Sequence, residues 1–233
     1  CREWDFGRRL ALLFADSHRH SYTGCKPAIS DILCGATALV AEANNIERIA
    51  HVRSKMSEIA GSAELAYAAG IASALYGEKT SSGTFFPNTT YANVGRRLMG
   101  ENIYHEFNIL TEIAGGLIAT LPFEDEFISE ETKHDLDKYI MRNPKIPPEV
   151  AHRIWRFVEN LGASPMAIWY QIAGVHGGGS PIMETITLNQ EYDYESKKNI
   201  AKYLAGINQE LDQSKDLKEK PFKLLSPERL SER

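Results

Sequence analysis

The sequence predicts an all-α helical bundle. Apolar residues recur at steps of three and four along most of the chain, and no stretch alternates apolar and polar residues for long enough to form a sheet. With 43% hydrophobic residues, the 233-residue chain can bury a sizeable core. We expect one helical domain over residues 1–208 and a charged C-terminal tail over 209–233, which two prolines interrupt.

The first predicted helices follow from apolar spacing. An apolar run predicts a buried helix over 31–44, and a second pattern predicts a long amphipathic helix over 47–76, whose Ala-rich part lets a neighbouring helix approach closely. A turn that contains a proline, 83–88, precedes a helix over 89–114. Two glycines at 115–116 end that helix.

Local capping signals predict the later helices. Ser129 is a candidate N-cap for a helix through Tyr139, and two prolines at 147–148 open a helix through Asn160. Ser164 combines an N-cap with a proline at the first helical position of the next helix.

The run HRHSYTGCK over residues 18–26 is the first candidate site. Imidazole and thiolate bind zinc or iron–sulfur clusters, and the spacing of His18 and Cys25 lets a helix end supply the histidine while the following turn supplies the cysteine. Two ligands cannot hold a metal alone. An ordinary surface or core role for His18 stays open, and so does a mononuclear zinc site completed by His20 or Cys34.

This run and the residues that follow it, KPAISDILCGATALVAEANNIERIAHVRSKMSEI, resemble the C-terminal part of the 4-hydroxybutyryl-CoA dehydratases, within the 4-hydroxyphenylacetate 3-monooxygenase superfamily. The segments IAGGLIATLP at 113–122 and VHGGGSP at 175–181 follow in the same order and with similar spacing. The resemblance covers residues 1–205 and implies the C-terminal helical bundle of the acyl-CoA dehydrogenase-like fold.

The resemblance implies a lyase that uses FAD and a [4Fe-4S] cluster to remove water from a 4-hydroxyacyl-CoA by radical chemistry. The implied reaction is of the 4-hydroxybutyryl-CoA to crotonyl-CoA type, with vinylacetyl-CoA isomerase activity beside it. It implies His18 and Cys25 as cluster ligands, with His18 also a base. It also implies Tyr22 for proton or radical transfer and Lys26 as a positive charge near the substrate. Tyr22 shares a face with His18 if the helix continues, whereas Arg19 points away from that face.

The loop VHGGGSP over 175–181 is the second candidate site. Consecutive glycines let a backbone approach a ligand closely, and their N–H groups can bind a pyrophosphate if a helix begins at Ser180. By the resemblance, the loop lies near the flavin or substrate, with His176, Gly177, Gly178 and Ser180 as cofactor contacts. A helix-breaking connection without a ligand is the alternative.

The sequence departs from the family at one position. In the dehydratases a glutamate stands a few residues before the Val-His-Gly step, whereas here residues 172–174 are Ile, Ala and Gly. Glu184 lies beyond the loop, and a displacement of about eleven residues changes both distance and helix face. The missing glutamate therefore concerns which acyl-CoA the enzyme accepts more than whether it binds the cluster.

Composition limits the partners. The net charge is −5 with both signs interspersed, so we expect neither a nucleic-acid nor a membrane surface. Three cysteines are too few for a disulfide framework, which favours a reducing, cytoplasmic compartment.

The chain starts at Cys1, at the middle of the family's chain, so we expect a fragment, a processed product or a separate subunit. The resemblance implies an N-terminal-half polypeptide that supplies further cluster cysteines and flavin contacts, in a homo- or heterotetramer.

Two other functions stay open. A subunit of a flavin-dependent aromatic monooxygenase, of the 4-hydroxyphenylacetate 3-monooxygenase type, keeps the bundle and the glycine loop but needs no metal. A noncatalytic assembly subunit of such an enzyme would use only the long helices, as packing surfaces. The HRHSYTGC run favours the dehydratase, because neither alternative uses it.

Overall fold

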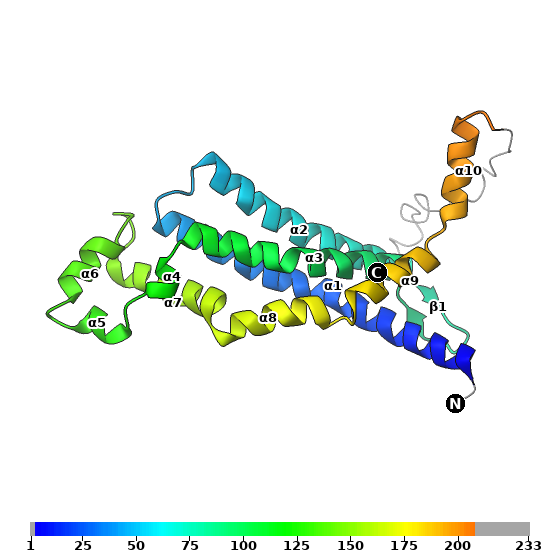
Figure 1. Ribbon diagram of the computed structural model, residues 1–233, viewed down its shortest axis with the longest axis horizontal. Coiled ribbons are helices and arrows are strands. Elements are labelled where there is room, and N and C mark those ends of the chain that lie inside the picture. Colours follow the sequence, from blue (N-terminus) through cyan, green and yellow to red (C-terminus); the bar gives the residue numbers. More distant parts are fainter. Residues whose placement is uncertain (1–2, 208–233) are drawn as a thin grey trace, which may run out of the picture. The chain divides into compact units, whose positions relative to one another are not determined.

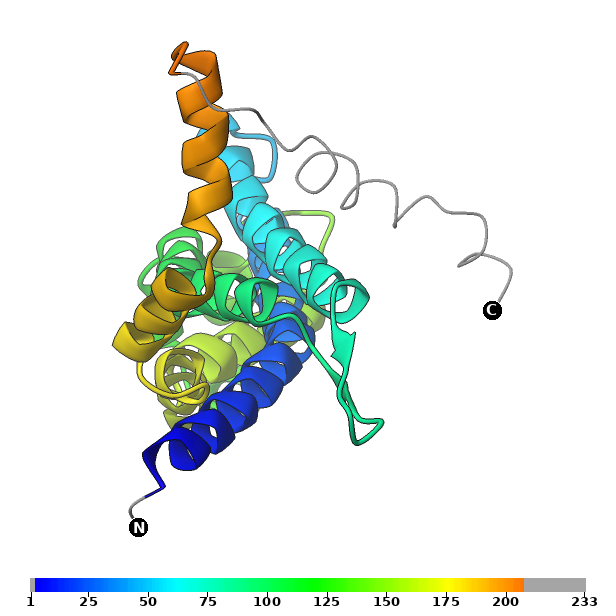
Figure 2. The ribbon, with the colours of Figure 1, turned by 90° about the vertical axis from the view of Figure 1, so that its right-hand side faces the viewer.

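The computed structural model describes residues 3–207 and confirms the predicted all-α bundle. Three long helices, α1 (Trp4–Ala43), α2 (Ala50–Leu75) and α3 (Thr89–Ala114), contact one another and run side by side in Figures 1 and 2. Two further helices, α7 (Pro148–Ala163) and α8 (Pro165–His176), pack on the same bundle, α7 against α1 and α8 against α3. The other described elements are β1 (Glu78–Lys79), β2 (Phe85–Phe86), α4 (Leu117–Thr120), α5 (Glu124–Ile128), α6 (Lys133–Ile140), α9 (Pro181–Glu191) and α10 (Tyr194–Leu204).

The chain divides into two compact units, Cys1–Thr187 and Leu188–Arg233. The first unit holds the bundle and all the residues of the candidate sites. In the second unit, α10 begins at an Asp193 cap, whose carboxylate accepts the N–H of Ser196 at 3.0 Å. The predicted charged tail over 209–233 lies outside the described residues.

Helix α1 is longer than the sequence indicated. The prediction that a helix ends near His18 and that a turn supplies Cys25 is wrong, because one helix of 40 residues continues through Gly24 and Pro27. The proline removes one backbone hydrogen bond, but buried side chains beyond it hold the helix against its neighbours. The continuous helix puts His18, Tyr22 and Cys25 on one face.

The limits of the other long helices agree with local signals. Helix α3 begins after Asn88, whose side chain accepts the N–H of Tyr91 at 3.2 Å, and it ends at Gly115, which has a φ of 72°. Helix α8 begins after Ser164, whose hydroxyl accepts the N–H of Met166 at 3.1 Å. The predicted Ser164 cap is therefore confirmed.

Two local features differ from the sequence prediction. Ser129 does not cap α6, which begins at Lys133. Its hydroxyl instead accepts the N–H of Glu131 at 3.3 Å in the turn before that helix. The two short antiparallel strands β1 and β2 form a hairpin between α2 and α3, where only a turn was expected.

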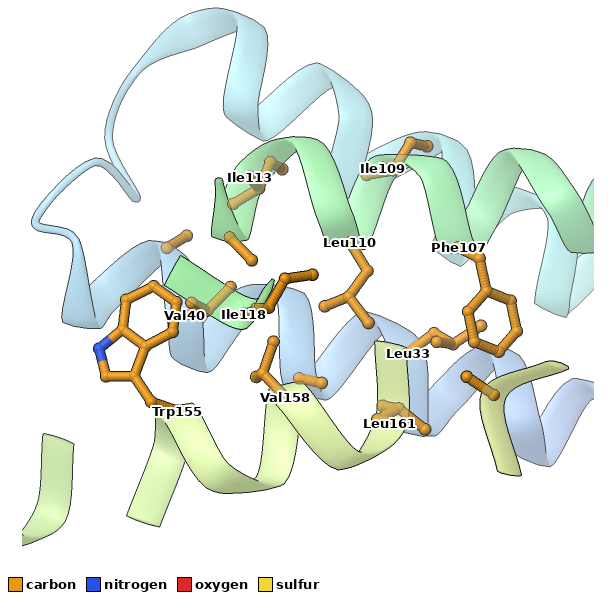
Figure 3. Close-up of a cluster of buried hydrophobic side chains, with 14 of the residues drawn as sticks. Leu33, Val40, Phe107, Ile109, Leu110, Ile113, Ile118, Trp155, Val158 and Leu161 are labelled. Carbon is orange, nitrogen blue, oxygen red and sulfur yellow. The ribbon is translucent and has the colours of Figure 1, made fainter. Parts of the chain in front are cut away.

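The apolar core lies where α7 packs against the second halves of α1 and α3 (Figure 3). Leu33 and Val40 of α1 meet Leu110 of α3 and Trp155 and Val158 of α7, and each of these side chains is fully buried. Each buried side chain of this size contributes about 1.5–3 kcal/mol of hydrophobic stabilisation. This core fixes the relative positions of the helices that also carry the candidate site.

Helix α1 is long enough to cross a membrane, and it contains an 18-residue window that is apolar enough by composition alone, with a mean hydropathy of 1.2. The bundle buries 44% of that window, and the helix also buries the charged side chains of Asp16, Arg19 and Lys26. A core helix of a bundle has this pattern of burial. The buried residues of α1 change from mostly polar before residue 31 to mostly apolar after it, and the polar half leads to the candidate site.

Candidate functional site

Helix α1 brings the predicted residues of the first site together. The ring of Tyr22 lies 5.2 Å from that of His18, centroid to centroid, in an edge arrangement. The Nζ atom of Lys26 lies 5.1 Å from the Tyr22 ring centroid, and the lysine is 4% exposed. Cys25 is an exposed free thiol on the same stretch of helix. Tyr22 is therefore the centre of this group.

A second cation, Arg96 of α3, also lies over the Tyr22 ring, with its Cζ atom 5.0 Å from the centroid. Arg96 is fully buried, and its Nη2 atom donates to the carbonyl of Val175 at 2.7 Å. Its Nε atom lies 3.6 Å from Oε1 of Glu184, which is also buried. The prediction from the sequence included neither Arg96 nor Glu184 among the site residues.

The glycine turn after α8 packs directly against these side chains. A Cβ atom added at Gly177 would lie 2.5 Å from Cζ of Tyr22, and one added at Gly178 would lie 2.8 Å from Cδ of Arg96. Gly177 has a φ of −64°, which any residue adopts, so the position requires space and not an unusual conformation. The two glycines let the backbone of the turn contact Tyr22 and Arg96.

The other two residues predicted in this loop are exposed. His176 is the last residue of α8, and Ser180 immediately precedes α9, so a helix does begin directly after the loop. That these residues, with Gly177 and Gly178, contact a flavin stays a prediction.

Arg19 belongs to the buried cluster, although the sequence placed it away from the site. Its Nη1 atom donates to Oδ1 of Asn93 at 2.6 Å, and its Nε atom donates to the carbonyl of Gly178 at 3.2 Å. Asn93 in turn donates to Asp16 at 3.1 Å. Arg19 does point away from the His18 face, but it points into the contact between α1, α3 and the glycine turn.

Burial dominates the electrostatics of the cluster. It raises the pKa of Tyr22, with the Arg96 charge acting in the opposite direction, and it lowers the pKa of Lys26. Burial also raises the pKa of Glu184, and the positive charges of Arg96 and Arg19 oppose that shift. Burial thus raises the pKa of a phenol and a carboxyl and lowers that of a lysine in one cluster, and clustered shifts of this kind mark a candidate functional site.

The described residues do not form a complete metal-ligand group. No three His, Cys, Asp or Glu side chains within 3–207 come together as a ligand group. The alternative of a zinc site completed by His20 or Cys34 is therefore wrong for this part of the chain. The imidazole of His18 and the exposed thiol of Cys25 lie on the same helix face, and these are donor types that iron–sulfur clusters use. That they ligate a cluster stays a prediction.

The family of the chain follows from its match over residues 8–206 to the family described as HpaB, 4-hydroxyphenylacetate 3-hydroxylase C terminal. The chain belongs to this family. It is 34% identical over 215 residues to the 4-hydroxybutyryl-CoA dehydratase/vinylacetyl-CoA-Δ-isomerase of Clostridium aminobutyricum, an alignment that covers 89% of the chain and 44% of that protein. The resemblance to the dehydratases, seen first in the HRHSYTGCK run, is confirmed.

Solved structures give the same relationship. An oxygen-tolerant archaeal 4-hydroxybutyryl-CoA dehydratase from N. maritimus superposes with a TM-score of 0.80 at 32% identity, over 97% of this chain and 45% of that one. The oxygenase component (HpaB) of 4-hydroxyphenylacetate 3-monooxygenase, complexed with FAD and 4-hydroxyphenylacetate, gives 0.73 at 21% identity, over 81% and 39%. The predicted acyl-CoA dehydrogenase-like fold is confirmed. The chain spans less than half of the length of these relatives.

Proposed function

We propose that this chain is the C-terminal-type part of a dehydratase that uses FAD and a [4Fe-4S] cluster and acts on a 4-hydroxyacyl-CoA. The proposed reaction is of the 4-hydroxybutyryl-CoA to crotonyl-CoA type, with vinylacetyl-CoA isomerase activity. The observation that carries the proposal is the alignment of His18, Tyr22, Cys25 and Lys26 on one face of α1, in a chain 34% identical to such a dehydratase.

The bound flavin and cluster supply one-electron chemistry and Lewis acidity that no side chain provides. His18 and Cys25 are the residues that would hold the cluster. The residues of this chain handle protons and charge: Tyr22 presents a phenol beside His18, and Lys26 holds a positive charge where a thioester carbonyl or a departing hydroxyl needs one.

Glu184 is the carboxyl group that we assign to acid–base chemistry at this site. The sequence offers no carboxylate at 172–174, but the first turn of α9 brings Glu184 beside Arg96, which itself lies over Tyr22. Burial raises the pKa of Glu184, so its proton is held more tightly than that of an exposed glutamate. This placement supports a dehydratase with its carboxyl group on the other side of the glycine turn.

We also propose that a polypeptide region equivalent to the part of the relatives that this chain does not span completes the site. It would supply the remaining cluster cysteines and flavin contacts. Cys25 is exposed, and Leu10 and Phe14, two turns and one turn before His18, are 59% and 71% exposed. An apolar, uncovered stretch beside an incomplete ligand set is the surface that such a region would cover. A homo- or heterotetramer remains our expectation for the assembly.

Anaerobic purification of the chain with the polypeptide that co-elutes tests this function. Iron, acid-labile sulfide and FAD are measured per chain, together with formation of crotonyl-CoA from 4-hydroxybutyryl-CoA. We expect near-equal iron and sulfide, with flavin, and loss of the iron in Cys25→Ser. The matched control is Cys34→Ser, because Cys34 packs against the apolar core and should not affect iron content. Flavin without iron, together with hydroxylation of a phenol, would instead identify the monooxygenase alternative.

A further inference from the structure

The guanidinium of Arg96 is fully buried but incompletely bonded. Its Nη2 atom donates to Val175, whereas its Nε atom stays 3.6 Å from Glu184. Within the part of the chain that the structure describes, neither Nε nor Nη1 has a hydrogen-bond partner. A buried charge with unpaired donors costs stability. The ion pair with Glu184 and the bond to Val175 thus leave two donors of this side chain without hydrogen bonds, and its contact with Tyr22 suggests a further role.

The contacts of Arg96 meet at Tyr22. The guanidinium lies over the ring at 5.0 Å, and the side chain also touches the turn at Gly178, next to the glycine that faces the Tyr22 hydroxyl. The ring is therefore confined by the guanidinium of α3, the backbone at Gly177 and the edge of His18. A tyrosine held in this way keeps its hydroxyl in one place relative to His18 and Lys26.

We propose that Arg96 is a positioning residue: it acts through Tyr22 by fixing the ring and hydroxyl of this tyrosine for the reaction. The inference rests on the proposed dehydratase function. Arg96 is fully buried and packs against the ring of Tyr22, so its effect on the reaction is expected to pass through this tyrosine. Its loss should lower kcat and leave KM nearly unchanged.

Arg19 provides the matched comparison. It is also a buried arginine that donates to the glycine turn, at the carbonyl of Gly178. Its other hydrogen bonds go to Asn93 and Thr187, away from Tyr22. Both arginines therefore hold the turn, and only Arg96 lies over the tyrosine ring. A variant of Arg19 separates the loss of turn contacts from the loss of tyrosine positioning.

A double-mutant cycle in the intact, flavin-loaded enzyme measures the coupling, with 4-hydroxybutyryl-CoA as the probe. We expect Arg96→Met to lower kcat by about two- to thirty-fold, the range of a cation–π contact. In a Tyr22→Phe background, the same change should lower kcat by less than about twofold, because no hydroxyl remains to be positioned. Arg19→Met loosens the turn but leaves the cation over the ring, so its effect on kcat should differ less between the two backgrounds than that of Arg96→Met. An equal effect of Arg96→Met in both backgrounds would overturn the proposal.

Nuclear magnetic resonance gives a second measurement that does not depend on activity. With ring-labelled ¹³C-tyrosine in the chain, Tyr22→Phe assigns the Tyr22 signal, and Arg96→Met should shift or broaden it more than Arg19→Met does. An unchanged Tyr22 signal would refute the positioning role. If Arg96→Met does not fold, Arg96→Lys, which keeps the charge without the planar contact, replaces it in both measurements. Absence of dehydration in the wild-type enzyme would refute the proposed function, and the Tyr22 signal would still decide the role of Arg96.

Discussion

Replacing Gly177 with alanine tests how closely the glycine turn approaches Tyr22. The backbone at Gly177, with a φ of −64° and a ψ of −23°, accepts alanine without strain, so the effect of the change is steric. The added Cβ atom would lie 2.5 Å from Cζ of Tyr22 and 2.6 Å from the carbonyl oxygen of Ala173. The Tyr22 hydroxyl would lie closer still. Ordinary contacts between such atoms are about 3.5–4.0 Å, so the ring or the turn must move by more than about 1 Å.

The expected loss of stability in Gly177→Ala follows from the cost of forcing a methyl group into a packed site. Such overpacking costs about 1–3 kcal/mol of unfolding free energy. For a chain of this length, each kcal/mol lowers Tm by roughly 2–4 °C. Thermal unfolding followed by circular dichroism measures the stability, and crotonyl-CoA formation in the intact enzyme should fall as Tyr22 is displaced.

Gly24→Ala is the control for the same chemical change. Gly24 lies in the middle of α1 with nothing within 4 Å of an added Cβ atom. Alanine is more favourable than glycine inside a helix by about 0.5–1 kcal/mol, so this variant should unfold at a higher temperature. If Gly177→Ala is as stable and as active as the wild type, the turn does not contact Tyr22 and the account of the site is refuted.

Three other changes test the bundle itself. Burial raises the pKa of Glu106, against the effect of its hydrogen bond from Ser30. The folded state therefore keeps a proton that the unfolded state releases above about pH 4.3, and stability should fall as pH rises toward the folded pKa. Glu106→Gln should flatten this decline in urea titrations between about pH 5 and 8, and an unchanged slope would contradict it. Trp155→Ala should cost about 3–5 kcal/mol in urea unfolding, since the side chain is fully buried. Asn88→Ala removes the cap of α3 and should cost about 1 kcal/mol in the same assay, and no loss would rule out the bond to Tyr91.

Most of the fold could be predicted from local signals in the sequence. Apolar spacing predicted α2, the proline turn and the two following glycines predicted the limits of α3, and Ser164 marked the start of α8. The continuity of α1 could not be predicted in this way, because Gly24 and Pro27 locally favour a break. Packing of the buried side chains beyond Pro27 overrides that preference, and this packing depends on helices that lie far away in the sequence.

The candidate site was predictable only along one helix. Tyr22 and Lys26 follow His18 at steps of four residues, so a single helix suffices to bring the three together. Arg96 and Glu184 come from α3 and α9, and their meeting depends on how the glycine turn crosses α1 and α3. No local sequence signal predicts that Arg96 and Glu184 meet.

One signal for the missed part was present in α1. The buried polar residues of this helix recur at steps of three and four, as a buried apolar stripe does. Such a stripe leaves no mark in the apolar spacing, because its members are charged or hydroxylated. Its members are Asp16, Arg19, Thr23, Lys26 and Ser30.

The close packing of the three long helices beside Tyr22 explains how a site on one helix can be held in place. Thr23 follows Tyr22 on α1 and lies between Gly70 of α2 and Gly95 of α3; added Cβ atoms at these glycines would lie 3.0 Å from its Cβ and 2.7 Å from its Cγ2. The absence of side chains at Gly70 and Gly95 lets both helices approach α1 at that level. Because α1 is held on two sides at this level, Tyr22 can move mainly by rotation of its own side chain. Arg96 and the glycine turn restrict that rotation.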